Sequence, residues 1–283
     1  MRHRATQDPF AALTRPLVIG HRGDPVHAPE NTLVSFESAL SRGADALEAD
    51  VRWARDGTLV VLHDEVVDRV SDGHGRVQDM TWRELSRLDF GHRFTPDGRT
   101  FPYRGRGIRI LTLRELLTRF PEARFTLEIK PKHPPSLAQF VREVVACGAE
   151  HRVLAASFHQ TVLERLRIMH PGIATGASSC EALSAMIRLQ AGLDVKRPSF
   201  RWLQVPHRMK GVPTLTGRWL RRARRAGIPV QVWTVNDARE MERWFERGID
   251  GIITDDPGQG VAARRRWLAA LSRTENGRKQ WIS

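Results

Sequence analysis

The sequence predicts an α/β protein, a closed parallel (β/α)8 TIM barrel. Short apolar runs alternate with amphipathic stretches from end to end of the chain. Several runs lack the apolar–polar alternation of a half-exposed strand, as expected where both faces of a strand are buried. A repeated strand-then-helix order is typical of parallel sheets and barrels. An open doubly wound sheet is the structural alternative.

Each predicted strand is a short apolar run, and each predicted helix carries apolar residues at helical spacing. The predicted strands are, in chain order, Leu17–Gly20, Leu47–Val51, Phe125–Ile129, Val153–Ser157, Gly172–Gly176, Trp202–Val205, Pro229–Thr234 and Gly251–Thr254. The predicted helices are Thr32–Arg42, Leu113–Phe120, Ser136–Cys147, Gln160–Met169, Glu181–Gln190, Thr216–Ala226, Ala238–Glu246 and Gly258–Leu271.

One segment interrupts the repeat. Thr58–His63 is predicted to pair as a hairpin with the second strand, and residues 64–110 after it are rich in Gly, Asp and Arg. Within them, Thr81 and Glu84 have the spacing of a capping box, which predicts a short helix at Thr81–Leu88. An ordinary loop is rarely this long, so we expect a small insertion after the second strand. The resulting organisation is an N-terminal arm (1–15), one barrel domain (16–271) and a basic tail (272–283) that we expect to be disordered.

Composition limits the class of protein. Hydrophobic residues make up 41% of the chain, enough for a large core. No apolar run approaches the roughly 18 residues of a membrane helix, and the first residues lack the apolar centre of a signal peptide. Because Cys147 and Cys180 are the only cysteines, a disulfide framework is not expected, and we expect a cytoplasmic location.

The net charge of +13 is unevenly distributed. The stretch from Lys196 to Arg225 contains ten Lys or Arg residues and no acid. Such a field favours anionic partners, namely a phospholipid surface, nucleic acid or a charged substrate. The preferred explanation is an arginine-rich composition with solvated helix faces, and charge alone selects no partner. We expect peripheral contact with an anionic membrane as a possible partner interaction, and no nucleic acid.

Acidic side chains gather at the ends of predicted strands. Side chains at positions i and i+2 of a strand share a face, so Glu48 with Asp50, and Glu128 with Lys130, each point the same way. Barrel enzymes build their sites at the carboxyl ends of the strands. Three carboxylates there predict a site for one divalent cation, Mg²⁺ or Ca²⁺, because oxygen ligands suit hard cations. The alternative is a carboxylate that only pairs with a neighbouring cation.

Two histidines, two cations and a tryptophan complete the predicted site. His21 and His63 each close an apolar run beside the acidic cluster and are the candidates for proton transfer. Arg22 and Lys130 offset the negative charge and can hold phosphate oxygens. Trp233 is a candidate pocket wall, with Gln204 and Phe158 as weaker candidates. We expect Asn31 to cap the first helix, its alternative being a supporting role with Glu30.

These motifs, taken together, resemble the glycerophosphodiester phosphodiesterase family, of the bacterial, cytoplasmic type. The resemblance runs from about Pro16 to Pro257 and rests on His21-Arg22-Gly23, Pro29-Glu30-Asn31-Thr32, Glu48-Ala49-Asp50-Val51, His63-Asp64, Glu128-Ile129-Lys130 and Val232-Trp233-Thr234-Val235-Asn236. It implies metal-dependent hydrolysis of glycerophosphodiesters to sn-glycerol 3-phosphate and an alcohol, with histidine acid/base catalysis. It also implies that Glu30 orients groups that contact the substrate, and that the insertion covers the mouth of the site and recognises the alcohol. Asp24-Pro25 after the His-Arg-Gly motif is an unusual departure from the family pattern.

Two alternatives stay open. A lysophospholipase D-type hydrolase would use the same chemistry on lysophospholipids at an anionic membrane. A non-enzymatic anion-binding barrel would gain little from three converging carboxylates. The sequence leaves undecided the alcohol, the choice of Mg²⁺ or Ca²⁺, the roles of the two histidines, attack by water or through a cyclic phosphate, the oligomeric state, and the role of the basic tail.

Overall fold

The protein folds as the predicted barrel. The computed structural model describes residues 7–195, 198–209 and 212–273. Its barrel strands lie parallel in the order β6-β5-β4-β2-β1-β11-β10-β7. A parallel bridge between Gly176 and Trp202 joins the two ends of this order, so the sheet closes on itself. The strands are β1 (Leu17–Gly20), β2 (Ala46–Trp53), β4 (Phe125–Ile129), β5 (Val153–Ala156), β6 (Ala174–Thr175), β7 (Leu203–Pro206), β10 (Val230–Trp233) and β11 (Gly251–Thr254).

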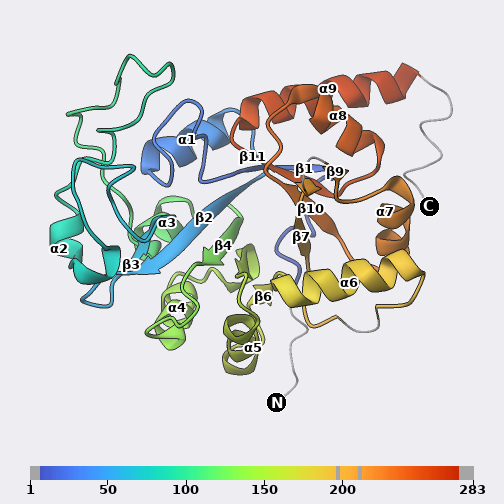
Figure 1. The fold of residues 1–283 in the computed structure, drawn as a ribbon, viewed down its shortest axis with the longest axis horizontal. Coiled ribbons are helices and arrows are strands. Elements are labelled where there is room, and N and C mark those ends of the chain that lie inside the picture. The colour runs from blue at the N-terminus through green and yellow to red at the C-terminus, as the bar shows by residue number, and fades with distance from the viewer. Residues whose placement is uncertain (1–6, 196–197, 210–211, 274–283) are drawn as a thin grey trace.

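Helices surround the strands on the outside (Figure 1). Each predicted helix is confirmed to within about two residues at either end. They are α1 (Leu33–Ser41), α3 (Leu113–Arg119), α4 (Leu137–Ala146), α5 (Gln160–Met169), α6 (Ser179–Ala191), α7 (Gly217–Arg225), α8 (Ala238–Glu246) and α9 (Pro257–Arg273). In the described part of the chain, no helix has the length and apolar character needed to cross a bilayer.

Apolar side chains fill both sides of the strands. Between strands and helices lie two large clusters, one around Phe125 and Phe140 and one around Trp244 and Phe245. At the amino ends of the strands, Phe10 of the N-terminal arm packs edge-on against Trp202, with ring centroids 5.4 Å apart. The arm therefore covers the end of the barrel opposite to the predicted site.

The insertion begins with β3 (Leu59–Val61), which pairs antiparallel with β2 as predicted. Residues 64–110 then form a separate lobe with η1 (Val77–Asp79), α2 (Trp82–Leu85) and their own apolar cluster (Figure 1). The predicted capping box is confirmed, because Thr81 and Glu84 bond to each other's backbone N–H. The helix ends at Leu85 instead of Leu88, since the chain turns at Ser86.

A short hairpin of β8 (Arg208–Met209) and β9 (Val212–Pro213) follows β7. The basic tail was expected to be disordered from residue 272, but Ser272 and Arg273 form the last residues of α9. Residues 274–283 lie outside the described residues. Part of the basic stretch, residues 196–197 and 210–211, lies outside them as well.

Candidate active site

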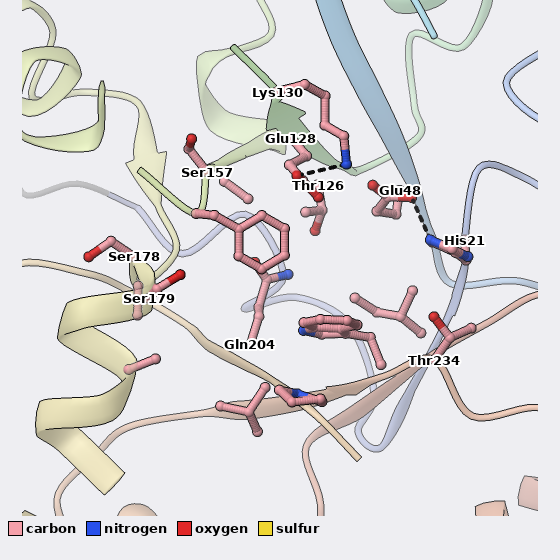
Figure 2. A pocket seen from close by; sticks show the side chains of 18 of the residues that line it. His21, Glu48, Thr126, Glu128, Lys130, Ser157, Ser178, Ser179, Gln204 and Thr234 are labelled. Atoms are coloured by element: carbon pink, nitrogen blue, oxygen red, sulfur yellow. Dashed lines mark hydrogen bonds and ion pairs between the residues drawn. The ribbon is translucent and has the colours of Figure 1, made fainter. Parts of the chain in front are cut away.

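A cavity of about 480 Å³ opens at the carboxyl ends of the barrel strands. Figure 2 shows it from close by, with His21 and Glu48 on one side and the start of α6 on the opposite side. Seven of the predicted site residues line it, namely His21, Arg22, Glu48, His63, Glu128, Lys130 and Trp233. Phe158 and Gln204, the weaker candidates for its wall, also line it.

Three carboxylates converge at one end of this cavity. Asp50 and Glu128 lie opposite each other in the register of β2 and β4, and Glu48 is two residues before Asp50 on the same face. One oxygen from each of the three lies within 4.8 Å of the others. Strand pairing thus places side by side three acids that the sequence spreads over some 80 residues.

Asp50 is buried and surrounded by partners. Lys130 Nζ lies 3.2 Å from its Oδ1, and Arg22 Nε lies 3.3 Å from its Oδ2. Asn31 Nδ2 donates to Oδ2 at 2.9 Å. Burial alone would raise the pKa of Asp50, but the charges of Lys130 and Arg22 outweigh it and hold that pKa below its usual value. Asp50 is therefore ionised.

Glu48 has the opposite environment. Burial, followed by the charges of Asp50 and Glu128, raises its pKa to about 8. Its Oε2 accepts the backbone N–H of Arg22 at 3.0 Å and lies 4.0 Å from His21 Nε2. Arg22 and Lys130 are two positive charges against three carboxylates, so the cluster has room for one more cation. These residues therefore fit a divalent ion, which would take the place of the Glu48 proton.

A threonine hydroxyl completes this end of the cavity. Thr126 lies on β4 two residues before Glu128 and is buried. Its Oγ1 has no hydrogen-bond partner among the described residues, although it faces the cavity. Because a buried polar atom without a partner is costly, this hydroxyl is an available contact for a ligand oxygen.

His21 is held by an acid from the far end of the chain. Its Nδ1 lies 2.6 Å from Asp255 Oδ1, and Asn236 Nδ2 donates to the other oxygen of Asp255 at 2.6 Å. Burial would lower the pKa of His21, but the hydrogen bond to Asp255 and the charge of Glu48 raise it above the usual value. With Nδ1 engaged, Nε2 is the ring nitrogen turned toward Glu48.

His63 is held by its neighbour in sequence. Its Nδ1 lies 2.6 Å from Asp64 Oδ1. Arg69 of the insertion donates to Asp64 Oδ2 at 2.6 Å and to both oxygens of Glu30 at 2.7 and 2.8 Å. Burial, with the charges of Arg22 and Lys130, lowers the pKa of His63 below its usual value, and the charge of Asp50 and the hydrogen bond to Asp64 do not fully offset this.

The loop after β1 has a backbone that explains the Arg-Gly pair. Arg22 has φ 55° and Gly23 has φ 94°. A Cβ at Gly23 would lie 2.4 Å from Ser35 Oγ and 2.7 Å from the Ser35 backbone carbon, so a larger residue does not fit. This turn points the Arg22 side chain at Glu30, whose Oε1 accepts from Arg22 Nη1 at 3.0 Å.

The expected cap of α1 by Asn31 is wrong. Thr32 is the N-cap residue, and no side chain caps the helix there. Asn31 instead has φ 58° and turns its amide inward to Asp50. The buried carboxylate is a charged acceptor for the amide N–H, whereas a cap would have used the amide oxygen to accept a helix N–H. The unusual Asp24 is buried as well and accepts from Ser38 Oγ and His27 Nδ1.

Four residues around the site had no predicted role: Asp255, Asn236, Arg69 and Thr126. Of these, Asn236 belongs to the motif Val232-Trp233-Thr234-Val235-Asn236. Asp255 directly follows β11, so a carboxylate at a strand end was the available signal. Thr126 shares a strand face with Glu128, which alternation along β4 could have indicated. Nothing in the local sequence of the insertion distinguishes Arg69 from its other arginines.

The chain matches known proteins along most of its length. Residues 21–259 match the model of the glycerophosphoryl diester phosphodiesterase family. The glycerophosphodiester phosphodiesterase of Caldanaerobacter subterraneus subsp. tengcongensis is 33% identical over 250 residues, which cover 85% of this chain and 94% of that protein.

The fold of this chain also matches solved structures of phosphodiesterases. A glycerophosphodiester phosphodiesterase from Agrobacterium tumefaciens superposes with a TM-score of 0.71 at 25% identity, covering 87% of this chain and 99% of that one. An Oleispira antarctica phosphodiesterase in complex with the product sn-glycerol-3-phosphate does so with a TM-score of 0.68 at 25% identity, covering 88% and 97%. The chain therefore belongs to the glycerophosphoryl diester phosphodiesterase family, a family of phosphoric diester hydrolases.

Proposed function

We propose that this protein hydrolyses glycerophosphodiesters to sn-glycerol 3-phosphate and an alcohol. The observation that carries the proposal is the cluster of three carboxylates at one end of the cavity, together with two histidines that are each held by an aspartate. The Oleispira relative, bound to sn-glycerol-3-phosphate as its product, supports the identity of the product.

Glu48, Asp50 and Glu128 would hold one divalent cation, Mg²⁺ or Ca²⁺. When bound there, the ion would supply positive charge against the phosphate oxygens. Asn31 and Lys130 keep Asp50 ionised and fixed for this task. The raised pKa of Glu48 supports the assignment, because burial and the neighbouring carboxylates disfavour its negative charge and a bound cation would offset both.

His21 and His63 would move the protons of the reaction. Each ring is fixed through Nδ1 by a carboxylate, which leaves Nε2 for the substrate. One histidine takes the proton of the attacking oxygen, and the other gives a proton to the leaving alcohol oxygen. The attacking oxygen belongs to water or to the neighbouring glycerol hydroxyl.

Arg22 and Lys130 would bind the non-bridging phosphate oxygens and stabilise the charge that develops on them. Glu30 positions Arg22 through the 3.0 Å contact with Nη1. Trp233 would form the wall on which the glycerol or alcohol carbons pack. Its ring meets Phe158 edge-on, with centroids 5.8 Å apart.

The test is a panel of glycerophosphodiesters incubated with chelator, with Mg²⁺ or with Ca²⁺. We expect release of glycerol phosphate with at least one of the ions and none with chelator. Absence of release with every ion and every diester would overturn the proposal and favour the anion-binding alternative.

We also propose that α7 attracts anionic surfaces. Its solvent-exposed arginines include Arg218, Arg221 and Arg225, and the helix carries no acid. The expected outcome is association with anionic vesicles at low salt that disappears at high salt. Equal behaviour toward neutral and anionic vesicles would contradict it.

A further inference from the structure

The cavity has two ends of different chemistry. The charged residues that line it, His21, Arg22, Glu48, His63, Glu128 and Lys130, all belong to the end described above. The opposite end, which we call the apolar arm, is formed by Phe158, Ala182, Leu183, Met186, Pro206 and Trp233. Figure 2 shows the start of α6, marked by Ser178 and Ser179, across the cavity from His21 and Glu48.

Three polar side chains near the apolar arm, those of Ser157, Gln204 and Ser178, already have hydrogen-bond partners. Ser157 Oγ donates to the backbone oxygen of Ile129 at 2.8 Å. Gln204 Nε2 donates to Gln231 Oε1 at 2.8 Å. Ser178 Oγ accepts the backbone N–H of Glu181 at 3.3 Å. A charged part of a ligand would lose its hydration in the arm without gaining an ionic partner, whereas a hydrocarbon part would lose nothing.

The outer part of the arm carries large apolar side chains that face solvent. Phe158 is 49% exposed and Leu183 is 59% exposed. An apolar surface that is continuous with a polar cavity is typical of a site for an amphipathic ligand. Hydrocarbon that covers these side chains would be stabilised by the burial of apolar area on both partners.

The arm lies on the other side of the cavity from the insertion. His63 and Arg69 belong to the insertion side, whereas the arm is built from the segments after β5 and β6 and from the last residues of β7 and β10. If the alcohol leaves on the side of His21, across the cavity from α6, the part of the substrate that keeps the phosphate extends into the arm. That part is the glycerol and whatever is esterified to it.

We propose that the apolar arm binds the acyl chain of a monoacyl glycerophosphodiester, so that the preferred substrates are lysophospholipids. This inference rests on the proposed function of the same site. In the net reaction, the P–O bond to the head-group alcohol breaks and a P–O bond to an oxygen derived from water forms. One water proton ends on the alcohol oxygen, the other passes to solvent, and the products are monoacylglycerol phosphate and the alcohol.

The test compares two substrates that differ only in the chain, glycerophosphocholine and a short-chain lysophosphatidylcholine kept below its micelle concentration. Choline release measures both reactions. We expect kcat/KM to be at least ~10-fold higher for the lysophospholipid, and to rise by up to about fourfold for each methylene that the arm buries.

Two variants of α6 make the test specific. Leu183→Asp places a charge in the arm and should lower the ratio of the two kcat/KM values at least ~10-fold. Ile187→Asp is the matched control, because Ile187 lies one turn further on α6, is 60% exposed and does not line the cavity. It should keep the wild-type ratio.

The outcomes separate the two proposals. Cleavage of glycerophosphocholine with no preference for the lysophospholipid would overturn this inference and leave the proposed function standing. Cleavage of neither substrate with any divalent ion would overturn the proposed function itself. An equal ratio for Leu183→Asp and Ile187→Asp would show that the arm does not hold the chain.

Discussion

The two histidines of the site have the same partner chemistry in different surroundings. Each ring has its Nδ1 2.6 Å from an aspartate oxygen. The aspartate of His21 directly follows the last barrel strand and is held by Asn236. The aspartate of His63 is the next residue and is held by Arg69 from the insertion. The pKa of His21 is raised and that of His63 is lowered.

This difference indicates which histidine is the general acid and which is the general base. A raised pKa favours the protonated ring of His21 and a lowered pKa favours the neutral ring of His63, which are the states of an acid and a base. We therefore propose that His63 accepts the proton of the attacking oxygen and that His21 gives one to the leaving oxygen. The acid, His21, is positioned by residues of the barrel alone, whereas the base, His63, is also positioned by Arg69 of the insertion.

The largest expected effect comes from removing either ring. His21→Ala and His63→Ala should each lower kcat by at least ~10²-fold, because proton transfer in the transition state is lost. His74→Ala is the matched control, since His74 pairs with Asp68 at 3.1 Å but is 74% exposed and lies outside the cavity. Near-normal turnover in one ring variant would remove that histidine from the mechanism.

Metal affinity should depend on pH through Glu48. Its carboxyl has a pKa of about 8, so below that pH a proton competes with the cation. Calorimetric titration with Mg²⁺ or Ca²⁺ should give an affinity that falls by up to about tenfold for each pH unit below 8, with proton release on binding. The Glu48→Gln variant should bind the cation more weakly, and its affinity should no longer depend on pH in this way. A pH-independent wild-type affinity would contradict the assignment of Glu48 as a ligand.

Replacing the aspartate that holds each histidine tests directly which histidine is the acid and which is the base. Asp255→Asn removes the hydrogen bond that raises the pKa of His21, so the alkaline limb of the pH–rate profile should move to lower pH. Asp64→Asn removes a bond that raises the pKa of His63, so the acidic limb should move to lower pH. We expect kcat to fall about tenfold in each. Movement of the opposite limbs would exchange the two roles.

The smallest effect concerns the insertion. Arg69→Gln removes the bonds to Asp64 and Glu30 and should lower kcat/KM by about three- to tenfold through misplacement of His63 and Arg22. Because Arg69 is half exposed, the stability loss should stay within about 1 kcal/mol. Arg76→Gln, which breaks the exposed pair with Glu65, is the control and should match wild type. Equal kinetics for both variants would show that the insertion does not position the base.

Most of the fold could be predicted from local sequence. The strands β1, β4 and β11 and the helices α5 and α8 begin and end where the apolar pattern placed them. The strand β6 spans only Ala174–Thr175, whereas Gly172–Gly176 was predicted. Gly172 and Ile173 continue the apolar run but do not pair with β5. Asn31 was predicted as a cap because the spacing to the helix favours it, and only the fold shows the buried Asp50 that takes its amide.

By itself the sequence determined the barrel repeat and which acids, histidines and cations stand at strand ends, because alternation and period are local properties of the chain. Only the tertiary structure decided which of them meet. The pairing of Gly20 with Thr254 when β11 joins β1 places Asp255 beside His21, 234 residues away. The apolar arm likewise exists only where segments after four strands converge. Contacts of this kind depend on closure of the barrel, which no local pattern encodes.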